Sequence, residues 1–107
     1  MKISASIQAA NQLDLLGHIN SNNTKFDQLH IDITDGHFAE NISMSFKVIE
    51  MLKNNTDYYL DVHLMIVNPE KYIEKFAELG SDILTIHYEA SKDTLVESLK
   101  SIIKFFH

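Results

Sequence analysis

The side chains with the clearest capacity for chemistry are two histidines and an aspartate on two short segments. His30 and Asp32 stand two residues apart in the stretch LHIDITDGHF, and His63 lies in the stretch LDVHLM. Two imidazoles and a carboxylate form a ligand set for a divalent cation such as zinc or iron, with coordination positions left open for a substrate. The alternative is that each histidine is a hydrogen-bonded structural residue, which is the commoner role in a half-polar strand.

Both stretches have the alternation of half-buried strands. Successive residues of a strand point to opposite faces, so the apolar residues of LHIDITDGHF share one face while His30 and Asp32 share the other. The same parity puts Asp61, His63 and Met65 on one face of the second stretch. Asp61 can fix a neighbouring histidine or lysine, or it can be solvated or hydrogen-bonded in the core.

Strand and helix patterns alternate along the whole chain. Alternating residues predict strands over residues 2–7, 26–33, 59–65 and 83–88. Capping residues and apolar residues at helical spacing predict four helices. These run from Asn11 to the turn Ser21-Asn22-Asn23, from Ser45 to Asn54, from Asn68 to Gly80, and from Ser91 to His107, where Leu95, Leu99, Ile102, Ile103 and Phe106 are expected to be buried. A loop over residues 37–44 follows the turn signal Asp35-Gly36.

Unbroken alternation of strands and helices predicts an α/β fold with a parallel sheet. Strands of an open doubly wound sheet are covered on both faces and are apolar throughout, whereas each of these strands has one polar face. One-sided polarity predicts the wall of a barrel whose inner face lines a site. A complete (β/α)8 TIM barrel has eight units in about 250 residues. Residues 1–107 are therefore expected to form a single partial barrel domain with four units.

Composition excludes several classes of function. The formal net charge is −6, and the chain has no arginine, which argues against a nucleic-acid partner. No apolar stretch is long enough for a membrane span or a secretory signal, so we expect no membrane partner and a cytoplasmic location. The absence of cysteine excludes disulfides and thiolate metal sites.

Several motifs closely resemble those of the ribulose-phosphate 3-epimerase family. They are LHIDITDGHF followed by Asn41, LDVHLM at residues 60–65, NPEKYI at 68–73 and HYEA at 87–90, in matching order and spacing, and residues 3–7 resemble the first strand of that family. The resemblance covers essentially the whole chain. It implies the N-terminal half of a ribulose-phosphate-binding TIM barrel and an isomerase of carbohydrate metabolism in the pentose phosphate pathway. This enzyme interconverts D-ribulose 5-phosphate and D-xylulose 5-phosphate at the third carbon.

The resemblance also implies roles for individual residues. His30, Asp32 and His63 would bind one divalent metal ion, which could be zinc, iron, manganese or cobalt. Asp32 would also be one of two acid/base carboxylates. Ser6, His63 and Met65 would contact the substrate. Thr34 stands where the family usually has methionine, so we expect a hydroxyl facing the pocket there. His87 faces inward by parity, and we expect it to have a packed, hydrogen-bonded role.

The second acid/base aspartate and the phosphate-binding loops of that family belong to the other half of the barrel. We therefore expect this chain to be truncated and to be inactive or weak unless completed. The expected partners are a small sugar phosphate and either a missing C-terminal half or further copies in a homo-oligomer. Two alternatives stay open, namely a 3-epimerase of a hexulose phosphate such as allulose 6-phosphate, and a non-catalytic half-barrel interaction module.

Overall fold

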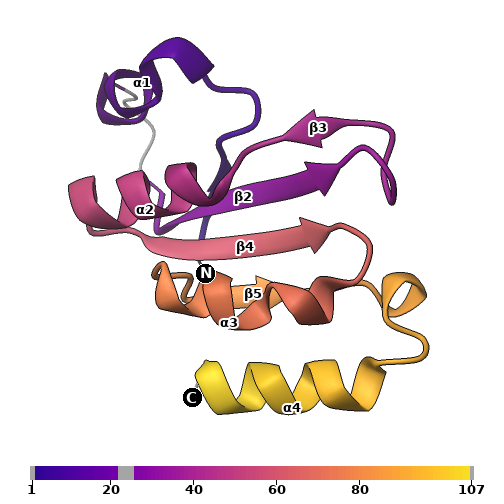
Figure 1. Cartoon of the computed structure of the whole chain (residues 1–107). Helices are drawn as coiled ribbons and strands as arrows, with labels where there is room; N and C mark the ends of the chain where they lie inside the picture. The colour runs from indigo at the N-terminus through magenta and orange to yellow at the C-terminus, as the bar shows by residue number, and fades with distance from the viewer. Residues whose placement is uncertain (1, 22–25, 107) are drawn as a thin grey trace.

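The structure is a computed structural model that describes residues 2–21 and 26–106. Four parallel strands form its sheet in the order β1-β2-β4-β5 (Figure 1). They are β1 (Ser4–Ser6), β2 (Gln28–Asp35), β4 (Tyr59–Met65) and β5 (Ile83–Thr85). A short strand, β3 (Ile42–Ser43), pairs antiparallel with the end of β2. The parallel α/β prediction is confirmed, and β2 and β4 are the long central strands.

Helical segments connect the strands and leave the alternation intact. They are η1 (Gln12–Asp14), α1 (Leu15–Ser21), α2 (Phe46–Asn55), η2 (Pro69–Lys71), α3 (Ile73–Glu78), η3 (Tyr88–Ala90) and α4 (Leu95–Phe105). The side chain of Asn11 accepts a hydrogen bond from the Leu13 backbone N–H, as a capping residue should. Gly80 follows α3 with a φ of 110°, a conformation that favours glycine and ends the helix. The predicted turn residues Asn22 and Asn23 lie outside the described residues.

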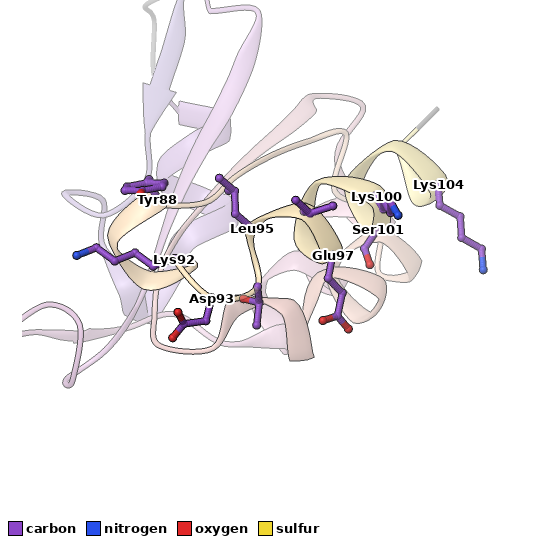
Figure 2. A pocket seen from close by; sticks show the side chains of 10 residues that line it. Tyr88, Lys92, Asp93, Leu95, Glu97, Lys100, Ser101 and Lys104 are labelled. Atoms are coloured by element: carbon purple, nitrogen blue, oxygen red, sulfur yellow. The ribbon is translucent and has the colours of Figure 1, made fainter.

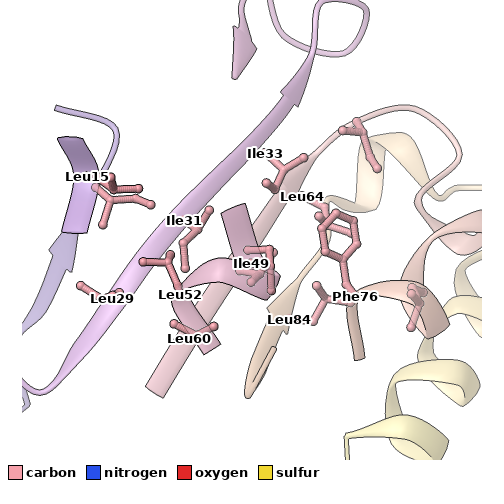
Figure 3. Close-up of a cluster of buried hydrophobic side chains, with 14 of the residues drawn as sticks. Leu15, Leu29, Ile31, Ile33, Ile49, Leu52, Leu60, Leu64, Phe76 and Leu84 are labelled. Carbon is pink, nitrogen blue, oxygen red and sulfur yellow. The ribbon is translucent and has the colours of Figure 1, made fainter. Parts of the chain in front are cut away.

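The hydrophobic core lies between one face of the sheet and the helices α1, α2 and α3 (Figure 3). The strands contribute the apolar positions predicted from their alternation. Those positions on β2 and β4 are almost completely buried, as are Ile49 and Leu52 of α2 and Ile73 and Phe76 of α3. Because this face takes up the apolar residues, the polar positions of the same strands point to the opposite face.

Several local predictions are wrong, and these errors come from packing that a single strand or helix pattern does not reveal. The expected loop over residues 37–44 contains β3, which exists only because β2 lies beside it. The first helix, predicted to start at Asn11, begins as the 3-10 turn η1, and Leu13 within it is 99% exposed. The fourth strand ends at Thr85 rather than at residue 88, because the chain turns into η3.

The last helix differs most from its prediction. It begins at Leu95 rather than Ser91 and ends at Phe105, and His107 lies outside the described residues. Ile102 and Phe106 pack against the core as expected, and Ser98 is fully buried. Leu99 and Ile103, predicted to be buried, are 46% and 61% exposed. The helix packs on α3 and η2 along one side, so only part of its wide apolar face is covered.

In the part of the chain that the structure describes, no helix is both long enough and apolar enough to cross a membrane.

Candidate metal centre

The pairing of β2 with β4 brings the three predicted ligand residues together. Asp32 stands directly beside His63, and His30 stands directly beside Asp61 in the register of the two strands. Residues at these positions point away from the core, on the face that α1, α2 and α3 leave uncovered. The side chains of His30, Asp32 and His63 are 29%, 16% and 24% exposed, so the group is accessible but partly desolvated.

Each histidine turns one ring nitrogen toward the same carboxylate oxygen. The Nε2 of His30 lies 2.9 Å from the Oδ1 of Asp32, and the Nδ1 of His63 lies 3.1 Å from it. One ligating atom from each residue lies within 4.8 Å of the others. Two donors bound to one zinc ion at tetrahedral angles lie about 3.4 Å apart. Nitrogen and oxygen donors that converge this closely fit a divalent cation with small side-chain adjustments.

Asp61 fixes the orientation of the His30 ring. The Nδ1 of His30 lies 2.9 Å from the Oδ2 of Asp61, whose side chain is only 17% exposed. Because a carboxylate only accepts, the Nδ1–H of His30 donates this bond, and in the contact with Asp32 the Nε2 of His30 also carries a hydrogen. Such an outer carboxylate typically fixes a metal-binding histidine. The interpretation of Asp61 as the partner of a neighbouring histidine is confirmed.

The two carboxylates also change the acidity of His30. Burial opposes its protonation, but the hydrogen bonds to Asp61 and Asp32 outweigh that effect and raise the pKa of His30 above its ordinary value of 6.5. A cation bound at the Nε2 would therefore compete with a proton that these carboxylates favour.

His63 has an outer partner that the sequence left unassigned. Its Nε2 lies 2.7 Å from the Nε2 of His87, and the two rings stack with centroids 4.8 Å apart. The predicted inward, hydrogen-bonded role of His87 is confirmed, whereas its partner was missed. The register carried a usable signal, because Thr85 stands beside His63 and His87 follows one step of the strand alternation later.

The predicted substrate residues lie on the same face as the three ligand residues. Ser6 stands beside His30 in the pairing of β1 with β2, and Met65 stands beside Thr34 in the pairing of β2 with β4. Their contact with substrate remains a prediction. Thr34 is 6% exposed and lines a hollow beside α2 and α3 that does not include the three ligand residues. Its Oγ1 lies 2.9 Å from the Oγ of Ser43. Ser43 in turn donates to the Asp32 carbonyl, so this pair attaches β3 to β2.

Two larger hollows lie away from the three ligand residues. One, of about 710 Å³, lies beside the start of α4, with lysines 92, 100 and 104 around it (Figure 2). The other, of about 430 Å³, lies between the segments that follow β2 and β4 and the helices α2 and α3. Neither is lined by His30, Asp32 or His63, so the candidate centre is an open sheet face rather than part of either hollow.

A parallel sheet of strand-helix units with a converging histidine and aspartate set on its inner face defines an α/β protein of the barrel class. The model of the Ribulose-phosphate 3 epimerase family matches residues 2–105. The chain belongs to this family, and its fold is consistent with the N-terminal half of the TIM barrel of that family.

Similar proteins carry the same family name. The chain is 45% identical over 76 residues to the cytoplasmic isoform of ribulose-phosphate 3-epimerase from Oryza sativa subsp. japonica, covering 71% of this chain and 33% of that protein. It is 44% identical over 78 residues to ribulose-phosphate 3-epimerase from Chlamydia pneumoniae, a match that covers 73% of this chain and 33% of that protein. It is 50% identical over 64 residues to that of Bacillus subtilis strain 168, covering 60% and 30%. The chain spans about a third of the length of these relatives.

Proposed function

We propose that this chain supplies half of the active site of a metal-dependent ribulose-phosphate 3-epimerase, which interconverts D-ribulose 5-phosphate and D-xylulose 5-phosphate. The observation that carries the proposal is the convergence of His30, Asp32 and His63 on one face of the sheet within 4.8 Å. Membership of the family and the names of the relatives supply the substrate. The proposed location is the cytoplasm, as the name of the rice isoform states for that protein.

The residues present suit the removal of a proton next to a carbonyl. Such a proton is weakly acidic, so a base must lie within hydrogen-bond reach of it. The carboxylate of Asp32 is that base in our proposal, since it is partly desolvated and still reachable from the open face. The imidazoles of His30 and His63 hold it in place through its Oδ1.

His30, Asp32 and His63 would hold one divalent ion, which is zinc, iron, manganese or cobalt in this proposal. When bound, such an ion supplies a Lewis acid for the negative charge that develops on the substrate oxygens. Ser6 and Met65, on either side of the three ligand residues, would contact the sugar.

Inversion of a carbon centre needs a second proton donor on the opposite face of the substrate. The described residues of this sheet present only one face to a ligand, so we propose that the donor and the phosphate contacts come from a C-terminal half or from another copy of the chain. The net charge of −6 is consistent with a small sugar phosphate as partner rather than a nucleic acid or a membrane surface.

The test is a chimera in which residues 1–107 replace the corresponding part of the Bacillus subtilis protein. We expect the chimera to exchange the hydrogen at the third carbon of ribulose 5-phosphate with D2O, as measured by proton NMR. Asp32→Asn should reduce that exchange about 100-fold or more, the scale of losing a general base. The exposed Asp57→Asn should leave it unchanged.

Three outcomes would contradict the proposal. Full exchange in the Asp32→Asn chimera would show that Asp32 is not the base. Faster exchange with allulose 6-phosphate than with ribulose 5-phosphate would favour the hexulose-phosphate enzyme. A folded chimera with neither exchange nor Co²⁺ binding would favour the non-catalytic module.

A further inference from the structure

His63 has contacts on both ring nitrogens, and the two contacts have different requirements. Its Nδ1 lies 3.1 Å from the Oδ1 of Asp32, and its Nε2 lies 2.7 Å from the Nε2 of His87. A carboxylate can only accept a hydrogen bond, so in the contact with Asp32 the Nδ1 of His63 carries the hydrogen. A nitrogen that binds a cation must present its lone pair instead. The Nδ1 of His63 must therefore carry a hydrogen to bond to Asp32 but must be free of hydrogen to bind a cation.

We propose that His87 is a positioning residue that resolves this conflict by exchanging tautomers with His63. When the Nδ1 of His63 carries the hydrogen, its Nε2 accepts from the Nε2–H of His87. When that Nδ1 presents its lone pair, the Nε2–H of His63 donates to the Nε2 of His87. In this second arrangement the hydrogen between the two Nε2 atoms belongs to His63, the earlier Nδ1 hydrogen of His63 has gone to solvent, and a hydrogen from solvent is on the Nδ1 of His87. Both rings are partly exposed to solvent, and each holds one hydrogen in both arrangements. The effect of His87 on cation binding rests on the proposed metal centre. The hydrogen bond between His63 and His87 does not depend on a metal.

An imidazole is suited to this role because it can both donate and accept. The carboxylate partner of His30 cannot do this, since Asp61 only accepts and holds its hydrogen-bond partner in one tautomer. The second nitrogen of His87 also has a suitable neighbour. Its Nδ1 lies 3.6 Å from the Oε2 of Glu89, where a hydrogen on Nδ1 is electrostatically favoured.

The position of His87 is well defined by the residues around it. Its carbonyl accepts a hydrogen bond from the Oγ of the fully buried Ser91, which anchors the start of η3. The ring packs between His63 and Phe38, with centroid distances of 4.8 Å and 5.0 Å. These contacts hold the ring of His87 next to the ring of His63.

The first measurement uses the ring ¹⁵N shifts of the full chain by long-range NMR correlation, after chelation and again with added Zn²⁺. We expect His63 to carry its hydrogen on Nδ1 and His87 on Nε2 after chelation. With Zn²⁺, the hydrogens should be on the Nε2 of His63 and the Nδ1 of His87. In a chain that binds Zn²⁺, a His87 tautomer that is the same in both samples overturns the proposal.

The second measurement is the affinity for Co²⁺ alone, followed by visible absorption. His87→Phe removes the donor and acceptor but keeps an aromatic ring, and it should weaken binding about 10- to 100-fold, the usual loss for an outer partner. His87→Gln can donate or accept at a similar position and should stay within about threefold of the parent chain. The exposed His37→Gln should not change binding. Equal affinity in all four chains overturns the proposal.

These readouts separate two possible failures. If the parent chain binds no Co²⁺, the metal centre of the proposed function fails. The role of His87 is then decided by the tautomers after chelation: a hydrogen on the Nε2 of His87 and on the Nδ1 of His63 retains the hydrogen bond, and any other distribution overturns it. If His87→Phe does not fold by circular dichroism, His87→Ala replaces it with the same expected loss.

Discussion

Asp32 lies between two histidines whose outer partners differ in kind. Its Oδ1 contacts the Nε2 of His30 and the Nδ1 of His63. The far nitrogen of His30 donates to the carboxylate of Asp61, whereas the far nitrogen of His63 contacts another imidazole. The two imidazoles of the candidate centre are thus not equivalent, because one is held by a carboxylate and the other by an imidazole.

Asp61→Asn should weaken Co²⁺ binding by about tenfold. The carboxylate of Asp61 fixes the tautomer of His30 and raises the basicity of its ring, and the amide of asparagine lacks the charge that does both. The measurement is a Co²⁺ titration of the full chain followed by visible absorption. The exposed Asp57→Asn is the matched control and should bind Co²⁺ as the parent does. If Asp61→Asn binds Co²⁺ as tightly as its control, Asp61 does not support the metal centre.

Among the structural elements, the segments that follow β2 and β4 are joined through one carboxylate. Asp35 accepts hydrogen bonds from the backbone N–H groups of His37 and Phe38, and its other oxygen accepts from the N–H of Val67. Burial opposes ionisation, but these three bonds together outweigh it and lower the pKa of Asp35 below its ordinary value of 3.8. The carboxylate therefore stabilises the folded chain in its charged form.

Because the pKa of Asp35 is lower in the folded chain than in the unfolded chain, its contribution to stability decreases as the pH falls. The stabilisation is complete above the unfolded value of about 3.8 and is lost as pH falls through the lower folded value. At about pH 7, Asp35→Asn should reduce the free energy of unfolding by about 1 kcal/mol, a modest figure because the group is partly solvated. The difference from the parent should shrink toward about pH 3 in urea unfolding experiments.

The exposed Asp93→Asn provides the control for this pH series. It should show a small difference from the parent at every pH. A deficit in Asp35→Asn that stays constant down to the lowest pH at which both chains fold would show that the charge of Asp35 does not stabilise the two segments.

The elements that sequence predicted best are those whose burial follows from their own alternation. Residues 59–65 form β4 with the predicted bounds, and His30, Asp32 and His63 share a face because strand parity alone decides it. The less accurate predictions depend on neighbours. The exposure of Leu99 follows from α4 having one packed side, and the His63 to His87 contact requires the register of β5 against β4. Neither property is encoded within one segment.

At the scale of the whole molecule, the described chain leaves apolar surface uncovered. Val96, Leu99 and Ile103 on α4 are 68%, 46% and 61% exposed, and Ile83 on the edge strand β5 is 41% exposed. Among residues 2–21 and 26–106, β1 and β5 each have only one strand neighbour in the sheet order. Open edges and apolar patches of this kind promote association between chains.

We expect the chain to self-associate as its concentration rises, and the double variant Leu99→Lys/Ile103→Lys to weaken that association at least about tenfold, since two apolar contacts are lost. Analytical ultracentrifugation over a range of concentrations measures this effect. Thermal unfolding should be little changed, because both side chains are largely exposed. A parent chain that is monomeric throughout, or a variant that associates equally, contradicts this expectation.

The in-register pairing of β2 with β4 has a consequence for folding. A slip of one residue would turn every side chain of β4 to the other face, so an apolar residue would replace His63 beside Asp32. The His30, Asp32 and His63 set exists only in the native pairing. A cation held by all three would add its binding free energy to that pairing alone. The site would then favour the native register of the two central strands over slipped registers while the sheet forms.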